Sequence, residues 1–300
     1  MAELTTAISE ARPGGAVSSG AARASLSARR AEQRLARRAI SSQLGVVLPP
    51  LLVVVAVVAA WQMWVSLFHV PRYLVPAPSR VWQRVIDDRA ALWQAFQSTA
   101  TSALLGYLAA IALGFLVAVA FASNRVVQRC FYPFAITLQT VPIIAIAPII
   151  IVWAGPGKLA IVIITFIITV FPVIANATIG LMSTDHNLLN LFAINNASRL
   201  QLLWKLRLPN AMPYIVTGLK ISAGLSVIGA IVGEFFAGRG GASSGLGSLI
   251  TFSSARLQTD MLFAATLTAS LLGIGFFLVI NQLGNYAVRN WHESATKREN

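Results

Sequence analysis

Two charged residues, Lys220 and Glu234, lie inside a long apolar stretch of the sequence. A carboxyl group within a membrane span is costly, so it is by default a candidate functional group, here one that lines or gates a translocation path. Two other interpretations of Glu234 stay open, namely contact with lipid headgroups or pairing with an arginine such as Arg239. Lys220 is expected to extend its long side chain to the nearer membrane surface.

Residue combinations typical of enzymes are missing from this sequence. Gly157-Lys158 lacks the other residues of a phosphate-binding loop. The three histidines show no metal-ligand spacing, and neither paired carboxylates nor a Ser-His-Asp set can be assembled. The glycine-rich segment 238–247 follows no strand, and a flexible outer loop explains it better than a phosphate site. We therefore predict a protein that is not an enzyme, with no catalytic residue and no metal.

The composition predicts a membrane protein. Of the 300 residues, 56% are hydrophobic and 11% are charged, which is far more apolar than a soluble domain. The net charge of +13 could suggest nucleic acid, but the charges lie mainly between apolar stretches. We expect membrane lipid and no nucleic acid as partners.

Six apolar stretches are long enough to cross a bilayer, which predicts an all-α membrane protein with six transmembrane helices. They are residues 44–68, 99–122, 131–154, 159–182, 214–237 and 261–288. An amphipathic helix is expected before the second span, from Ser79 to Phe96, along the outer membrane surface. The small residues Gly229 and Gly233 predict close helix packing in the fifth span, for which a subunit interface is a candidate place.

Three prolines mark the third span as irregular, and the fourth span holds Pro172 and Asn176. A proline inside a span is tolerated where neighbouring helices or water satisfy the carbonyl groups that lose their partner. Such a helix is expected to pack within protein and is a candidate to line a path. The candidate residues for the translocation path or gate are Gln139, Pro142, Pro148, Asn176 and Glu234.

The domain prediction is a basic flexible tail (1–43), a six-span transmembrane domain (44–290) and a short tail (291–300). Fifteen of the 23 Lys and Arg residues lie on the side that holds both termini. This bias places both termini in the cytoplasm of a multi-pass protein of the plasma or inner membrane. The arginines of the N-terminal tail are consistent either with an amphipathic helix on anionic lipid or with a solvated tail.

The polar segment 183–213 between the fourth and fifth spans has helical periodicity of its own. A first piece is expected over residues 187–194, with a break at Asn195-Asn196. Leu200, Leu203, Trp204 and Arg207 then share one face of a second short helix, which Pro209 is expected to end. Two short helices could insert into a groove of a partner. A surface helix resting on the membrane is the alternative.

The segment from Asn196 to Tyr214, followed by Gly218-Leu219-Lys220, resembles the cytoplasmic "EAA" loop of ABC importer permeases. The nitrate/sulfonate/taurine-type branch is the most similar. Further similar stretches follow in order, beginning Val75-Pro-Ala-Pro, Gln139-Thr-Val-Pro, Gly229-Ala-Ile-Val-Gly-Glu and Gly245-Leu-Gly. The sequence departs from the family at Asn190-Leu-Phe, which replaces Glu-Ala-Ala, and at Asn196, which replaces a glycine.

This resemblance implies a type I importer that works by alternating access. Its parts are two permease subunits (a homodimer or two paralogues), two ATPase subunits in the cytoplasm and an extracytoplasmic substrate-binding protein. The chain itself would hold no cofactor, because ATP binds to the partner subunit. The residues implied to couple to the ATPase are Asn195, Asn196, Ala197, Ser198, Arg199, Leu200, Leu203, Trp204, Leu208 and Pro209.

The resemblance leaves the solute open. Members of the branch carry sulfonates, taurine or nitrate, or heterocyclic vitamin precursors such as the thiamine pyrimidine or riboflavin. Residues 188–192 are slightly more similar to the vitamin-precursor permeases. The alternative function is an ATP-independent secondary transporter or channel, for which inverted repeats or an acidic relay are expected. The proline-rich third span disfavours a structural scaffold.

Overall fold

The computed structural model describes residues 48–50, 52–238 and 245–292, and all the regular structure in these ranges is helical, as the sequence predicts. The chain divides into two units, residues 1–67 and 68–300. In the first unit, a helix spans Leu48–Leu67 and is apolar and long enough to cross a membrane. The basic tail and Arg239 lie outside the described residues.

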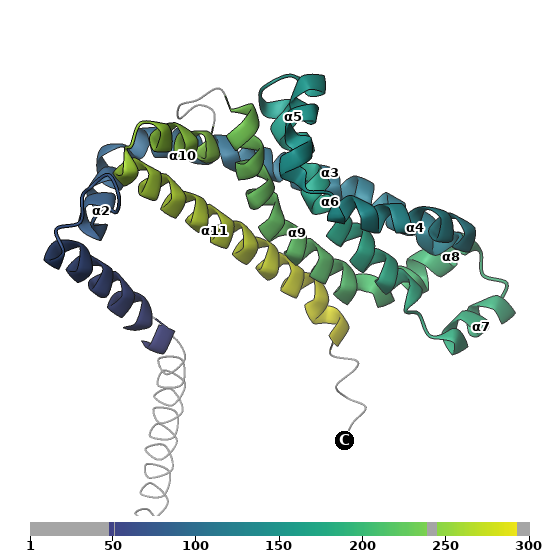
Figure 1. Cartoon of the computed structure of the whole chain (residues 1–300). Helices are drawn as coiled ribbons and strands as arrows, with labels where there is room; N and C mark the ends of the chain where they lie inside the picture. Colours follow the sequence, from purple (N-terminus) through teal and green to yellow (C-terminus); the bar gives the residue numbers. More distant parts are fainter. Residues whose placement is uncertain (1–47, 51, 239–244, 293–300) are drawn as a thin grey trace, which may run out of the picture. The chain divides into compact units, whose positions relative to one another are not determined.

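The second unit is a helical bundle (Figure 1). Four of its helical segments are long and apolar enough to cross a membrane, namely Arg89–Ser123, Lys158–Met182, Arg199–Ala237 and Thr259–Val288. Its helices are α2 (Pro78–Asp87), α3 (Arg89–Ser123), α4 (Arg125–Thr140), α5 (Ile143–Ala154), α6 (Lys158–Met182), α7 (His186–Ile194), α8 (Arg199–Leu202), η1 (Leu203–Arg207), α9 (Leu208–Ala237), α10 (Leu246–Ala255) and α11 (Thr259–His292).

Helices α3, α6 and α9 form the core through small residues. A Cβ atom on Gly229 of α9 would lie 2.9 Å from the Thr165 Cα atom of α6, and one on Gly106 of α3 would lie 2.5 Å from the Thr165 Cβ atom. The Ser222 hydroxyl donates a hydrogen bond to the Thr169 carbonyl oxygen of α6 (2.8 Å). Because only glycine allows such backbone approach, α6 and α9 pack as a rigid pair.

The predicted third span is not one helix. It consists of α4 and α5, which are separated by Val141 and Pro142 in extended conformation. The physical reason is Pro142, which lacks an N–H group and disfavours helical geometry in the residue before it. The predicted irregularity is therefore confirmed and takes the form of a complete break.

The expected amphipathic helix from Ser79 to Phe96 is also divided. Helix α2 ends at Asp87, and α3 begins at Arg89, ten residues before the predicted start of the second span. A salt bridge between Arg84 and Asp88 (2.7 Å) lies at the junction. The resulting 35-residue helix is longer than the roughly 20 residues that a bilayer requires.

The prediction that Pro209 ends the second loop helix is wrong. Helices α8, η1 and α9 run without interruption from Arg199 to Ala237. Pro209 occupies the first turn of α9, directly after the five-residue π-helical segment η1, in which the Leu208 N–H donates to the Leu203 carbonyl oxygen. Since a π turn changes which carbonyl groups need a donor, the missing N–H of proline does not break the helix.

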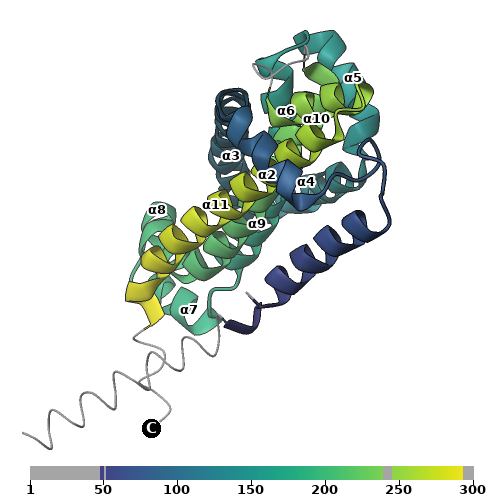
Figure 2. The same cartoon turned by 90° about the vertical axis from the view of Figure 1, so that its left-hand side faces the viewer.

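The expected flexible loop over 238–247 is wrong in its last part, because Gly245 is the N-cap residue of α10 and Leu246 begins it. Figures 1 and 2 show α10 at the end of the bundle opposite to α7 and α8. Helix α9 connects the two ends, and its 30 residues correspond to about 45 Å of helix.

Candidate functional site

Between α6 and α9 the structure contains the first predicted short helix, α7, whereas the second, α8, is the beginning of the continuous helix that runs through η1 and α9. The Asp185 side chain accepts a hydrogen bond from the Asn187 N–H (2.8 Å) and caps α7. At the start of α8, Ser198 and Gln201 form a reciprocal capping box, with Ser198 Oγ accepting from the Gln201 N–H (3.2 Å) and Gln201 Oε1 accepting from the Ser198 N–H (2.8 Å). Both helices therefore have defined starts.

The break between these helices centres on Asn196. Its φ angle of 50° lies in the left-handed region, which asparagine tolerates better than most residues. The Asn196 N–H donates to the Ala193 carbonyl oxygen (3.0 Å) and the Ala197 N–H to the Phe192 carbonyl oxygen (3.0 Å). This pattern is a Schellman motif, in which glycine is usual and asparagine is the common substitute. Asparagine in place of glycine at position 196 is thus compatible with the backbone conformation that ends α7.

The loop is fixed to the bundle on one side of η1. Arg207 donates to the Ala122 carbonyl oxygen at the end of α3 (2.7 Å). Leu203 packs on a buried cluster that includes Leu181 and Ala211, and Leu208 and Pro209 are half-buried beside it.

The prediction that Leu200, Leu203, Trp204 and Arg207 share one face is wrong, because Leu203 and Arg207 contact the bundle whereas Leu200 and Trp204 are exposed. The physical reason is the π-helical turn of η1, which changes the angle between successive side chains.

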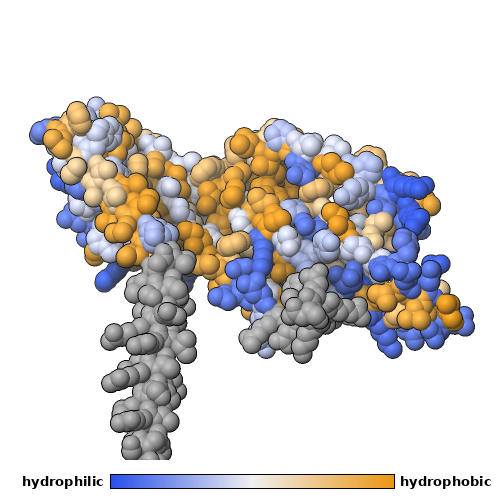
Figure 3. Space-filling model, turned by 90° about the horizontal axis from the view of Figure 1, so that it is seen from below, coloured by the Kyte–Doolittle hydropathy of each residue, from blue (hydrophilic) through white to orange (hydrophobic). Residues whose placement is uncertain are grey.

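The opposite side of the loop is apolar and exposed. Leu200 is 66% exposed and Trp204 is 61% exposed, and no residue of α7, α8 or η1 is buried. Asn195 and Arg199 are also exposed, and Ala197 is half-buried. In Figure 3, hydrophilic residues gather at the end that carries these helices, with an apolar patch among them. Exposed leucine and tryptophan on a rigid support are typical of a docking surface for another protein.

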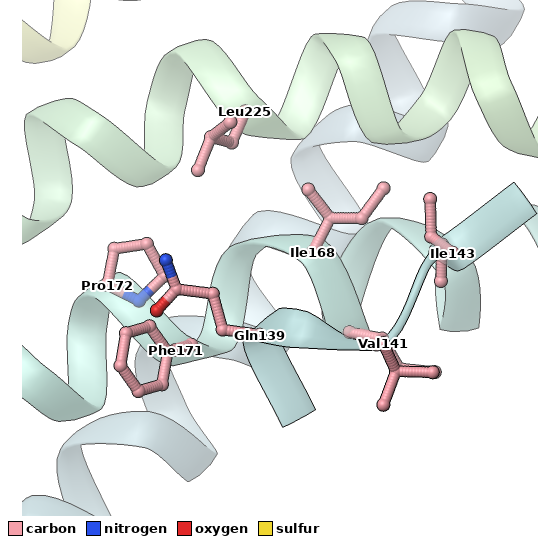
Figure 4. Close-up of a pocket in the computed structure, with 8 residues that line it drawn as sticks. Gln139, Val141, Ile143, Ile168, Phe171, Pro172 and Leu225 are labelled. Carbon is pink, nitrogen blue, oxygen red and sulfur yellow. The ribbon is translucent and has the colours of Figure 1, made fainter. Parts of the chain in front are cut away.

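A cavity of about 330 Å³ lies between the α4–α5 break, α6 and α9. Its wall includes Gln139 and Val141 beside the break, Phe171 and Pro172 of α6, and Leu225 of α9 (Figure 4). The Gln139 amide faces Pro172 in this view. The described lining contains one hydrogen-bonding side chain and no ionisable one. The volume is near the lower end of the range for small-molecule sites.

The other candidate path residues lie at different places. Pro142 is at the break itself as the N-cap of α5, whereas Pro148 is exposed in the middle of α5. Asn176 donates to the Pro172 carbonyl oxygen (2.9 Å), and it packs on Gly218 of α9. The structure therefore brings Gln139 to the cavity. Pro142 lies between two lining residues, Val141 and Ile143, and Asn176 lies one helical turn after Pro172 on α6.

Glu234 lies away from this cavity, 1% exposed at the end of α9. Its Oε2 atom accepts hydrogen bonds from the Thr99 hydroxyl (3.0 Å) and from the Gly247 N–H (2.8 Å). Contact with headgroups is thus wrong, because the side chain is buried. Sequence reasoning missed Thr99, since it is 135 positions from Glu234; the similarity of Gly245-Leu-Gly to the family was the available signal.

The remaining predicted residues hold helices together. Gly233 lies against Ile161 of α6, where a Cβ atom would be 3.0 Å from the Ile161 Cα atom, and Gly229 approaches Thr165 in the same way. Lys220 donates to Asn285 Oδ1 of α11 (2.7 Å). Within the described residues, no group of three or more His, Cys, Asp or Glu side chains is arranged to hold a metal ion.

Comparisons with known proteins identify the class. The family described as "Binding-protein-dependent transport system inner membrane component" matches residues 110–292, and the chain belongs to this family. A probable ABC transporter permease protein of Haemophilus influenzae is 35% identical, over 79% of this chain and 95% of that protein. The protein is therefore a multi-pass membrane permease of the ABC importer type, from the branch that the sequence resembles.

Two further relatives have names that specify a solute. The formylaminopyrimidine transport permease ThiX of Halalkalibacterium halodurans is 34% identical, over 79% of this chain and 94% of that protein. The riboflavin transport permease RibX of Chloroflexus aurantiacus is 31% identical, over 78% and 86%. Permeases named for taurine, nitrate and aliphatic sulfonates are similar at 28% identity or lower.

A solved structure confirms the fold. A chain of the MetNI methionine ABC transporter, in an inward facing conformation, aligns with a TM-score of 0.50 and 17% identity. The alignment covers 66% of this chain and 93% of that chain. The bundle is thus the type I importer permease fold.

Proposed function

We propose that this chain is the permease subunit of an ATP-driven importer, and that its coupling loop, residues 183–213, docks on an ATPase subunit. The observation that carries the proposal is the two-sided geometry of the loop. Leu203 and Arg207 attach it to the bundle, and Leu200 and Trp204 face outward. A partner that moves this loop also moves α9, because α8, η1 and α9 are continuous. The full importer has two permease subunits, two ATPase subunits and an external binding protein.

The solute proposed for the cavity is a small neutral heterocycle of the vitamin-precursor type. An anion such as taurine's sulfonate would lose its hydration in a lining that provides no cation, which is costly. A neutral ring can instead stack on Phe171 and exchange hydrogen bonds with the Gln139 amide, which both donates and accepts. The names of the relatives ThiX and RibX support the same class.

The test is transport by the reconstituted complex. Proteoliposomes that contain the permease, its ATPase and the loaded binding protein are assayed for uptake of labelled formylaminopyrimidine, riboflavin, taurine and nitrate. We expect ATP-dependent uptake of a heterocycle and none of the anions. ATP-independent uptake by the permease alone would refute the importer, whereas ATP-dependent uptake of an anion would refute only the solute class.

The proposed orientation, with both termini in the cytoplasm, rests on the distribution of Lys and Arg. Cys130, the one cysteine of the chain, provides a direct test because it is exposed in the first turns of α4, within residues 123–130, which the distribution of Lys and Arg places in the cytoplasm. A membrane-impermeant maleimide is expected to label Cys130 in inverted vesicles and not in intact cells. Labelling in intact cells would reverse the orientation.

A further inference from the structure

Helix α10 lacks an N-terminal cap of its own. Its N-cap residue is Gly245, which has no side chain and a φ angle of 105°. The first N–H groups of a helix need acceptors outside the helix. Here they come from two other helices, since the Leu246 N–H donates to Thr99 Oγ1 of α3 (2.8 Å) and the Gly247 N–H to Glu234 Oε2 of α9 (2.8 Å).

The two capping side chains are also bonded to each other. The Thr99 hydroxyl has one proton, which lies within reach of Glu234 Oε2 (3.0 Å) and of the Ala95 carbonyl oxygen (3.1 Å). A second bond connects α10 to α9, because the Ser248 hydroxyl donates to the Glu234 carbonyl oxygen (3.0 Å). Thr99, Glu234 and Ser248 are each at most 2% exposed. The cluster is therefore a buried junction of α3, α9 and α10.

Three glycines allow this junction to form. A Cβ atom on Gly247 would lie 2.5 Å from the Ile231 carbonyl oxygen and 2.9 Å from the Glu234 Cβ atom. One on Gly245 would clash with the Glu234 carboxyl group, and one on Gly238 with Ser248. Any larger residue at these positions would separate the first turn of α10 from the last turn of α9.

We infer that Glu234 and Thr99 are positioning residues that clamp α10 to α3 and α9, rather than residues that line the solute path. The clamp lies 26 residues, or about 39 Å of helix, from the end of α9 that joins the coupling loop. It makes α10 follow any movement of α9. The charge of Glu234 alone suggests that it lines the path. Its hydrogen bonds to α10 and α3 instead indicate that it positions α10.

What the clamp positions is the exposed far end of α10. There the Arg256 guanidinium lies over the Phe252 ring, 4.0 Å from its centroid, and Leu257 is 68% exposed. On the proposed function, this face is turned to the outside, and the partner that it meets is the loaded binding protein. Without the clamp, α10 would hold the docking orientation for only a fraction of the time, and the apparent affinity would fall by that fraction.

The first test is amide hydrogen exchange of the full chain in lipid nanodiscs, which needs no transport partner. In the wild type, we expect the amides of Leu246 and Gly247 to be as protected as those in the middle of α9. Thr99→Val removes the hydroxyl at nearly constant shape, and exchange at these amides should become about tenfold faster, as for the loss of a helix cap. Thr99→Ser should restore protection. Wild-type amides that exchange at the rate of unprotected ones would overturn the clamp even if no variant folds.

The matched control is Thr178→Val. Thr178 is 2% exposed, and its hydroxyl has no hydrogen-bond partner among the described residues. This variant should leave exchange in α10 unchanged. Equal acceleration in both valine variants would show general loosening and would overturn the clamp, as would unchanged exchange in Thr99→Val.

The second readout separates positioning from stability. In proteoliposomes with the ATPase, Thr99→Val should raise the concentration of loaded binding protein that gives half-maximal ATP hydrolysis by about tenfold. The maximal rate should stay within about twofold, because the coupling loop is intact. A fall in the maximal rate alone would contradict the positioning role. If no binding protein stimulates even the wild type, the proposed function fails, while the exchange result still decides the clamp.

Discussion

Replacement of Trp204 by alanine tests the coupling loop most directly. The Trp204 side chain is 61% exposed, and η1 contains no buried residue. Its truncation therefore removes little packing from the folded chain, and alanine favours helical conformation more than tryptophan does. We expect membrane insertion and the thermal unfolding midpoint to change little. The substitution should instead weaken binding of the ATPase subunit.

The size of that loss follows from the exposed area. A tryptophan presents up to about 250 Å² of surface, of which 61% is about 150 Å². At about 25 cal/mol per Å², full coverage by a partner would contribute at most about 4 kcal/mol. Part of this is lost to ordering and desolvation, but tryptophans at the centre of an interface commonly contribute at least about 2 kcal/mol. The affinity for the ATPase should thus fall by about 30-fold or more.

The assay measures binding of the purified ATPase subunit to the permease in nanodiscs, together with substrate-stimulated ATP hydrolysis. Trp82→Ala is the matched control, because Trp82 is 62% exposed and lies on α2, at the end of the bundle away from the loop. The control should bind the ATPase as the wild type does. If Trp204→Ala bound within about twofold of the wild type and kept normal stimulation, Trp204 would not belong to the docking surface, and the assignment of the loop would be refuted.

Three further changes have defined expectations. Asn196→Gly should keep coupling, measured as stimulated ATP hydrolysis. Asn196→Val should weaken coupling and lower the stability of the fold by about 1–2 kcal/mol in thermal unfolding, because valine tolerates a φ of 50° poorly. Gly229→Ala should destabilise by about 1–3 kcal/mol through overpacking on α6. Gly224→Ala should not, since nothing lies within 4 Å of its added carbon. Gln139→Leu should lower uptake of the heterocycle about fivefold without lowering the unfolding midpoint, as for one lost hydrogen bond.

Local sequence patterns predict a helix well where its own residues determine where it begins and ends. The apolar stretches of α6 and α11 begin and end within about four residues of the prediction. The break at Asn196 was also predictable, because asparagine favours turns and helix ends. The position of the break at Pro142 follows from proline chemistry, although three prolines in the span offered three places for it.

Features that depend on distant residues were not predictable. Pro209 is a helix terminator by its chemistry, yet η1 shifts the hydrogen-bond pattern so that the helix continues. Helix α10 has too few residues and too many preceding glycines for a helical pattern, and its cap is supplied by α3 and α9. The surroundings of Glu234 likewise depend on Thr99, which no local pattern connects to it.

The division of the bundle into rigid and movable parts indicates how the cavity opens. Helices α6 and α9 are held together by close backbone contact at Gly218, Gly229 and Gly233, so their walls of the cavity move as one body. The third wall is the break at Val141-Pro142, where no helical hydrogen bonds connect α4 to α5. We expect the solute to pass when this wall moves against α6 and α9. The test uses a chain with Cys130→Ser, Val141→Cys and Leu225→Cys, in which a bifunctional thiol reagent joins the two new cysteines across the cavity. The cross-link should stop uptake while ATP hydrolysis continues. Uptake that survives the cross-link would place the moving wall elsewhere.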